Sequence, residues 1–183
     1  MKGRKLGVQI VFLFLWPAVF AGAAGSREPF QPTVSHVDIG RFLGDWYVIA
    51  LLPSPPEKRA VNGVENYSLD DQGLIRVRYT FSQDSPDGKP RVMYQKGWII
   101  NRETNAEWRV RPLWPLKLPY YILELDPDYQ YTVIGTNNFR YLWIMARSPV
   151  LPEETLTGIL DRMEKRGYPR EKIRMMVQEW PHG

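Results

Sequence analysis

The side chains that usually carry enzymatic chemistry are scarce in this chain. It has no cysteine, and its two histidines, His36 and His182, lie near the two ends of the chain that remains when an N-terminal export signal is set aside. A thiol nucleophile, a thiolate metal site and a disulfide framework are therefore excluded. A Ser-His-Asp triad or a multi-histidine metal site is not expected either. We expect no catalytic residue, no metal and no cofactor.

The export signal is indicated by the order of residue types at the N-terminus. The formal net charge is +4, and Lys2, Arg4 and Lys5 account for most of it. An apolar run follows over residues 6–20, and small residues occupy positions 21–24. This order predicts a signal peptide over residues 1–23 that is cleaved after Ala23, with an uncleaved membrane anchor as the alternative.

Removal of that segment has two consequences for location and partners. The remaining chain carries too little basic charge for a nucleic-acid partner to be expected. It is exported, but it has no lipoprotein cysteine that could carry a covalent lipid anchor. We therefore expect it in the periplasm, associated with the outer membrane, or secreted.

The rest of the chain divides into a leader and one domain. Residues 24–41 are rich in proline, serine and charge, which predicts an extended leader. Residues 42–183 form the domain, and their pattern is one of short β-branched and aromatic runs separated by turn residues. Eight strands are predicted in this way, at 46–52, 61–69, 75–81, 91–99, 106–111, 120–125, 129–135 and 141–147. The prolines at 112, 115 and 119 are expected to exclude ladder structure before residue 120.

The pattern changes to a helical period after the last strand. Leu156, Ile159, Leu160 and Met163 follow the spacing i, i+3, i+4, i+7. This predicts one amphipathic helix at about 152–166, packed outside a sheet. The predicted fold is therefore all-β, an eight-stranded up-and-down antiparallel β-barrel with a C-terminal α-helix outside it. A β-sandwich with a filled core is the alternative.

Three segments carry a resemblance to a known family. They are the Gly40–Ala50 segment with its G-x-W motif, the turn at 125–129, and the Tyr141–Pro149 segment with its arginine. Together they resemble the lipocalin family, in particular its bacterial and apolipoprotein D-like branch. The resemblance covers roughly residues 42–177. It implies a ligand-binding barrel and, for the bacterial branch, lipid storage or transport in envelope maintenance.

The motif residues also have a physical interpretation as structural residues. Trp46 is large and flat enough to close one end of a barrel, and Gly44 allows the chain to approach it closely. Arg147 is expected to lie over the indole and to donate to unpaired carbonyl groups there. The resemblance adds the turn residues Asp128 and Tyr129 to this structural set.

Strand alternation predicts which side chains line the ligand cavity. If Trp46 faces inward, so do Val48 and Ala50, and on the third strand Ile75, Val77, Tyr79 and Phe81 form the inner row. Four further candidates line either the cavity or the outer face under the helix: Met93, Trp98, Trp108 and Tyr121. The loop at 53–59 and residues 114–116 are expected at the mouth. Candidate cations for a headgroup are Lys58, Arg59, Arg76, Arg78, Arg109, Arg111 and Lys117.

These observations favour a protein that binds a fatty acid or a lysophospholipid in the barrel and stores or transports it. Burial of an alkyl chain is sufficient for such binding, since each methylene contributes about 0.8 kcal/mol. Two other functions stay open. One is an enzyme on an apolar substrate that uses tyrosines, Glu124 or Asp126, and the other is an envelope carbohydrate-binding or structural β module. Peripheral outer-membrane association and a homodimer are also left open.

Overall fold

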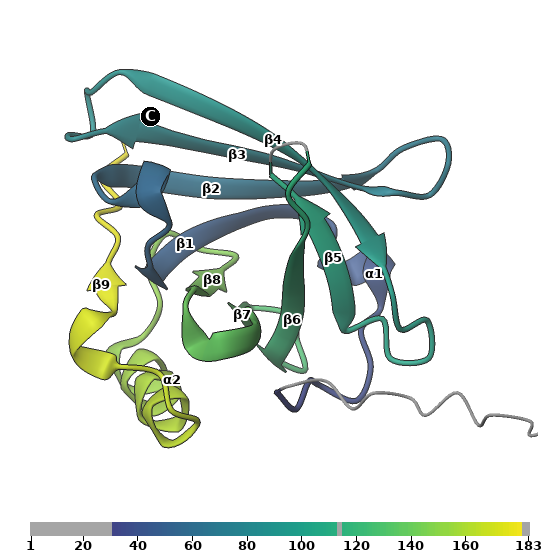
Figure 1. Cartoon of the computed structure of the whole chain (residues 1–183). Coiled ribbons are helices and arrows are strands. Elements are labelled where there is room, and N and C mark those ends of the chain that lie inside the picture. The colour runs from purple at the N-terminus through teal and green to yellow at the C-terminus, as the bar shows by residue number, and fades with distance from the viewer. Residues whose placement is uncertain (1–30, 113–114, 181–183) are drawn as a thin grey trace, which may run out of the picture.

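The computed structural model describes residues 31–112 and 115–180 (Figure 1). The predicted signal peptide, the first part of the leader, Trp114 and His182 lie outside the described residues. No helix among the described residues is both long enough and apolar enough to cross a membrane.

Nine strands and two α-helices make up the described chain. The strands are β1 (Gly44–Leu52), β2 (Ala60–Leu69), β3 (Ile75–Gln83), β4 (Pro90–Ile99), β5 (Glu107–Arg111), β6 (Leu118–Leu125), β7 (Tyr131–Gly135), β8 (Leu142–Ala146) and β9 (Arg174–Met175). The α-helices are α1 (Ile39–Phe42) and α2 (Glu153–Lys165). Short 3₁₀ turns are η1 (Pro55–Glu57), η2 (Asn137–Phe139) and η3 (Arg170–Lys172).

The first eight strands close into a barrel. Each of these strands pairs antiparallel with the next along the chain, and β1 pairs with β8 on one side and β2 on the other. This confirms the predicted eight-stranded antiparallel barrel and excludes the β-sandwich.

The helix α2 lies outside the barrel, as predicted (Figure 1). Its buried residues Ile159 and Met163 pack into an apolar group on the outer barrel surface, which we call the helix-side cluster. Arg162 on the helix pairs with Glu124 of β6 at 2.8 Å. Burial of the apolar face, together with this ion pair, holds the helix in place.

Two details of the strands differ from the sequence prediction. Proline 119 lies within β6, where it pairs with Arg109, so the ladder starts before residue 120. The position is tolerated because Pro119 is the second residue of its strand, near the strand end. The second difference is β9, which pairs with Ala50 and Leu51 of β1 and was not predicted as a strand.

The described part of the leader is packed against the barrel. The amide of Val34 donates to the carbonyl of Ile122 at 3.0 Å, and Val37 is fully buried. The chain then turns into α1, whose first residues fall inside the segment predicted to be extended. Asp38 caps this helix by accepting from the amide of Arg41, which explains the departure from an extended chain.

The helix α1 closes one end of the barrel around Trp46. The Arg147 guanidinium lies 3.8 Å from the centroid of the Trp46 ring. It also donates to four carbonyl groups at the end of α1 and the start of β1, those of Arg41, Phe42, Leu43 and Asp45. Gly44 has a φ of +95° and so adopts a conformation that other residues rarely tolerate. These contacts make this end the floor of the barrel.

We expect the substitution Trp46→Ala to lower the free energy of unfolding by about 3–5 kcal/mol, because it leaves a large void in a packed floor. Urea denaturation measures the change. The matched control is Trp180→Ala, since Trp180 is 41% exposed and its loss opens no internal void. Equal losses for the two variants would contradict the assignment of Trp46 as the closing side chain.

Candidate ligand-binding cavity

A cavity of about 370 Å³ lies inside the barrel at the end opposite the floor. Its size falls within the usual range of about 300–1,000 Å³ for small-molecule pockets. Its walls come from η1, β2–β6, β8 and the loops beside them. The lining residues are Ser54, Pro55, Pro56, Glu57, Glu65, Tyr79, Met93, Gln95, Val110, Pro112, Leu116, Leu118, Pro119, Tyr120, Thr136, Tyr141 and Trp143.

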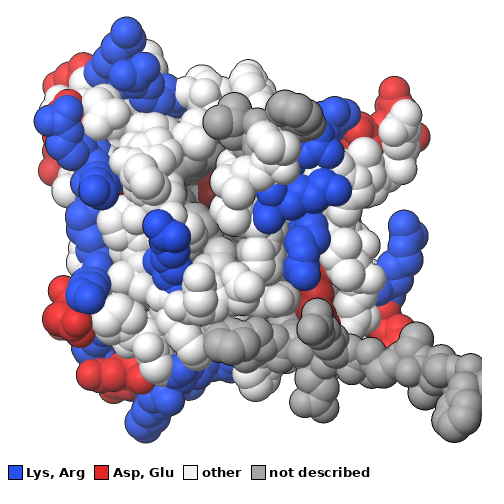
Figure 2. All heavy atoms as spheres, viewed as in Figure 1, with Lys and Arg blue, Asp and Glu red and all other residues white. Residues whose placement is uncertain are grey.

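Most of the lining is apolar or aromatic, and two of its rings, Tyr120 and Trp143, belong to a ring stack that continues to Trp108 in the core. Trp108 and Tyr120 stack with ring centroids 5.3 Å apart, and Tyr120 stacks on Trp143 at 6.5 Å. Among the described lining residues there is no lysine or arginine, whereas two carboxyl groups, Glu57 and Glu65, are present. Figure 2 shows the hollow on this face of the molecule, with acidic atoms visible inside it. The cavity therefore combines an apolar wall with acidic groups.

Glu57 is fixed in the cavity wall by its own turn. Its carboxylate accepts from the backbone amide of Ser54 at 2.9 Å and from the indole nitrogen of Trp143 at 2.8 Å. The Ser54 hydroxyl donates to the same carboxylate. This is a capping box across a single turn, and it aligns η1 with the wall of the cavity.

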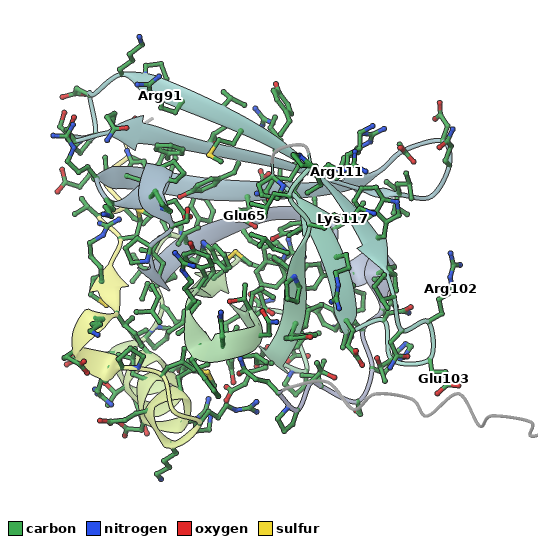
Figure 3. All side chains as sticks on the ribbon, in the orientation of Figure 1. Glu65, Arg91, Arg102, Glu103, Arg111 and Lys117 are labelled. Atoms are coloured by element: carbon green, nitrogen blue, oxygen red, sulfur yellow. The ribbon has the colours of Figure 1, made fainter. Side chains whose placement is uncertain are left out.

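Glu65 is the more deeply enclosed carboxyl group. Its side chain comes from β2, is 4% exposed, and lies inside the barrel (Figure 3). The Tyr67 hydroxyl donates to its Oε2, and the Tyr67 and Tyr120 hydroxyls are hydrogen-bonded to each other. Burial raises the pKa of Glu65 from 4.5 to about 7, and the nearby Glu57 adds to the increase, while the bond from Tyr67 opposes it.

The predicted inward-facing residues fall into three groups: those that line the cavity, one beside it, and those in the packed core. Tyr79 and Met93 line the cavity. Phe81 lies beside it, in a groove at the barrel rim that Met93 also lines. The other inward residues are part of the packed core rather than of the cavity lining: Val48, Ile75, Val77 and Trp108.

Three predicted positions do not face the cavity. Ala50 and Tyr121 belong to the helix-side cluster. For Ala50 the inward prediction was wrong, because a β-bulge between Val48 and Ala50 shifts the alternation by one residue. Trp98 faces outward instead, paired with Arg109 and covered by the cationic groups of Arg111 at 4.8 Å and Lys117 at 5.4 Å.

The residues that sequence reasoning missed are polar or aromatic positions on inward faces. Glu65, Tyr120 and Trp143 all line the cavity. Glu65 stands two positions before Tyr67 on the same strand, so strand alternation could have placed it inside. Trp143 alternates with the inward Met145 on β8 in the same way.

The turn residues of the structural set also have defined contacts. The Tyr129 hydroxyl accepts from the amide of Asp38 at 2.8 Å, and the Arg41 guanidinium lies 4.0 Å from its ring centroid. Asp128 is exposed, and the carboxylate that accepts the turn amides is that of Asp126. Tyr129 therefore links the turn to α1 and helps to fix the floor.

Outside the barrel, cations form a row across three strands. Arg76 of β3 is directly opposite Lys96 of β4, which is directly opposite Arg111 of β5. These three residues, which we call the outer basic row, line a surface groove beside the cavity. Like charges placed opposite each other destabilise a sheet. Asp70 offsets this for Arg76, at 2.6 Å, and no other ion pair to the three cations is present among the described residues. The described residues contain no cluster of His, Asp and Glu suited to a metal ion.

A closed antiparallel barrel with one sealed end and an apolar cavity at the other defines a small-ligand-binding barrel protein. The family comparison agrees with this class, because residues 37–178 match the model of the lipocalin-like domain. The chain therefore belongs to the lipocalin family, whose members bind small hydrophobic ligands.

Individual relatives support this membership over most of the chain. Mouse apolipoprotein D is 31% identical over 90% of this chain and 92% of its own. The outer membrane lipoprotein Blc of Vibrio cholerae is 24% identical, with coverage of 94% and 100%. Among solved structures, insecticyanin of Manduca sexta is 18% identical with a TM-score of 0.61, covering 81% of this chain and 84% of its own, which supports the fold.

The buried carboxyl group predicts a pH dependence of stability. Folded Glu65 keeps its proton up to about pH 7, whereas an unfolded glutamate releases it near 4.5. The folded state thus holds more protons in this window, so its stability falls as the pH rises through it. Relative to Glu65→Gln, the free energy of unfolding should fall by on the order of 3 kcal/mol between about pH 4.5 and about pH 7.

Urea denaturation at a series of pH values measures this difference. The exposed Glu103→Gln variant, which removes a carboxyl group far from the cavity (Figure 3), is the matched control and should follow the wild type. If the wild-type and Glu65→Gln curves run parallel, Glu65 does not hold its proton in the folded state.

Proposed function

We propose that the chain binds one small amphiphile, holds its alkyl chain in the cavity, and stores or transports it. The observation that carries the proposal is the apolar cavity of about 370 Å³ above a sealed floor. Burial of a dozen methylenes contributes on the order of 10 kcal/mol before the costs of association. After these costs are subtracted, the remaining binding free energy corresponds to micromolar to nanomolar affinity.

The ligand classes we propose are a fatty acid and a lysophospholipid. Both carry an anionic group at one end of an acyl chain. That group would stay at the mouth, because a carboxylate or phosphate on the inner wall would meet Glu57 and Glu65. Arg111 and Lys117 lie to the side of Glu65 in Figure 3, and Figure 2 shows basic side chains beside the hollow. Of the two classes, a lysophospholipid fits better, since its larger headgroup can reach these cations.

We propose binding rather than catalysis as the task of the cavity. Glu65, Tyr67 and Tyr120 are hydrogen-bonded to one another, and Glu57 is held by Ser54 and Trp143, so these acids already have structural partners. The stack of Trp108, Tyr120 and Trp143 lies in the interior, which favours an enclosed apolar ligand over a sugar bound on the outer surface.

The relatives support export and an envelope role for this chain. One relative is named an outer membrane lipoprotein, and this chain has no cysteine for such an anchor. We therefore propose an exported protein, periplasmic or secreted, that reaches a membrane surface by peripheral contact and serves envelope maintenance.

Filling the cavity tests the binding proposal. We expect Val110→Trp to weaken lysophospholipid binding by at least about tenfold, because the indole displaces several buried methylenes. Val110 lines the cavity and is 5% exposed. The same change at Val150, which is 72% exposed, is the matched control and should leave binding unchanged.

Titration calorimetry measures the affinity, and native mass spectrometry of the purified protein reveals any copurified lipid. Failure of lysophospholipid and fatty acid to bind the wild type would refute the proposal, as would binding of an oligosaccharide in their place. Equal affinity of the wild type and Val110→Trp would locate the ligand outside the cavity.

The outer basic row predicts attachment to anionic membranes. It lies beside the exposed ring of Tyr94, which is 72% exposed and suited to a membrane interface. Each cation near an anionic surface contributes about 1 kcal/mol. Replacing Arg76, Lys96 and Arg111 together by Gln should therefore weaken binding to vesicles that contain anionic lipid by roughly a hundredfold.

Vesicle cosedimentation at low and high salt measures this binding. The charge-matched control replaces Arg102, Lys165 and Lys172 by Gln, since all three are exposed and lie outside the outer basic row. Equal losses in the two triple variants would mean that attachment depends on net charge alone and not on the row.

A further inference from the structure

The inner wall of the cavity carries a carboxyl group that the described residues only half satisfy. The Tyr67 hydroxyl donates to Oε2 of Glu65. Since Tyr67 uses its single proton in this bond, the Tyr120 hydroxyl must donate to Tyr67 in turn. No donor among the described residues contacts Oε1 of Glu65. The chain of hydroxyl groups thus orients one oxygen of Glu65 and leaves the other for a partner.

A second polar group on the same wall lacks a partner. The Tyr79 hydroxyl is buried and has no hydrogen-bond partner among the described residues. Both groups line the cavity. Buried polar atoms are nearly always hydrogen-bonded, and leaving one unpaired costs about 1–3 kcal/mol. A ligand inside the cavity is positioned to satisfy both groups.

The charge around Glu65 determines what kind of polar group fits there. The groups that face it are Glu57 of η1, Tyr67 of β2, Tyr79 of β3 and Tyr120 of β6. A cation, Arg174 of β9, also acts on Tyr79, but its guanidinium donates to the backbone carbonyls of Glu57 and Ala60. Burial raises the pKa of each tyrosine well above 10, so these phenols stay neutral. A ligand group that donates hydrogen bonds is therefore favoured beside Glu65, and a cationic donor is favoured most, whereas an anionic group is repelled.

We propose that the cavity selects amphiphiles whose inner end donates hydrogen bonds, above all a long-chain alkylammonium, and that Glu65 is the group that receives this end. The inference rests on the proposed function, because it names the ligand class of the same cavity. An anionic amphiphile binds with its polar group at the mouth, whereas an ammonium enters head first and pairs with Oε1 of Glu65.

A set of three amphiphiles with equal chains tests the selection. The probes are decylammonium, decanol and decanoate, titrated below their aggregation limits by calorimetry at about pH 6 and about pH 8. The ammonium stays cationic and the carboxylate stays anionic over this range, since their pKa values lie near 10.4 and near 4.3. Any opposite change of their affinities with pH therefore reports on the protein.

The wild type should bind decylammonium more tightly at the higher pH, where Glu65 is ionised, and decanoate more weakly. Decanol should change least. Glu65→Gln should lower the preference for decylammonium over decanoate by at least about tenfold at the higher pH, which is the loss of one charge-assisted hydrogen bond. It should also remove both pH trends. The Glu103→Gln control should behave as the wild type.

Four results would overturn the inference. One is equal pH trends for decylammonium and decanoate in the wild type, a measurement that needs no variant to fold. The second is retention of the ammonium preference in Glu65→Gln, which would assign the acceptor to another group. The third is failure of all three probes to bind, which would refute the proposed function itself. Binding of all three without selection would leave that function intact and refute the selection alone.

Discussion

The stack of Arg147 on Trp46 is the contact on which the rest of the molecule depends. Eight strands of this length enclose an interior that side chains can just fill, so a hollow survives only if the filling is concentrated at one end. Trp46 supplies that filling, and Arg147 pairs the carbonyl groups that the turn from α1 into β1 would otherwise leave without donors. With the floor sealed, the space above it can stay open toward the loops at the other end.

Much of the fold could be predicted from local patterns, because turn residues separate the strands and a helical period marks α2. The two-residue strand β9 could not, since it has no period and depends on the shape of β1. Whether a side chain points into or out of the barrel was predictable only where the strand is free of bulges. Strand alternation predicted that Tyr79 points inward, and Tyr79 lines the cavity. The same rule failed at Ala50, because a β-bulge in β1 changes the alternation there. The bulge arises from the pairing of β1 with β8, and no residue type in β1 indicates it.

The candidate site was harder to predict than the fold because its chemistry is assembled across the barrel. Glu65 comes from β2, Tyr120 from β6 and Glu57 from the turn η1, and only closure brings them to one cavity. A glutamate in a strand is usually solvated. The residue type of Glu65 therefore indicated an outward side chain, whereas its distance of two residues from Tyr67 indicated an inward one. The strand position of Glu65 was predictable, but the raised pKa follows from burial by distant elements.

The outer and inner faces of the barrel wall carry charged groups of opposite sign. The outer basic row lies on the outer face of β3–β5, while Glu57 and Glu65 lie within, and Gln95 and Pro112 border both the outer groove and the cavity. An amphiphile that approaches this boundary meets cations first and carboxyl groups further in. Under the proposed ligand selection, the sign of the polar group determines the orientation: an anionic group stays outside with its chain buried, and a cationic group is drawn inward. We infer that one apolar cavity holds two ligand classes in opposite directions, with Glu65 distinguishing between them.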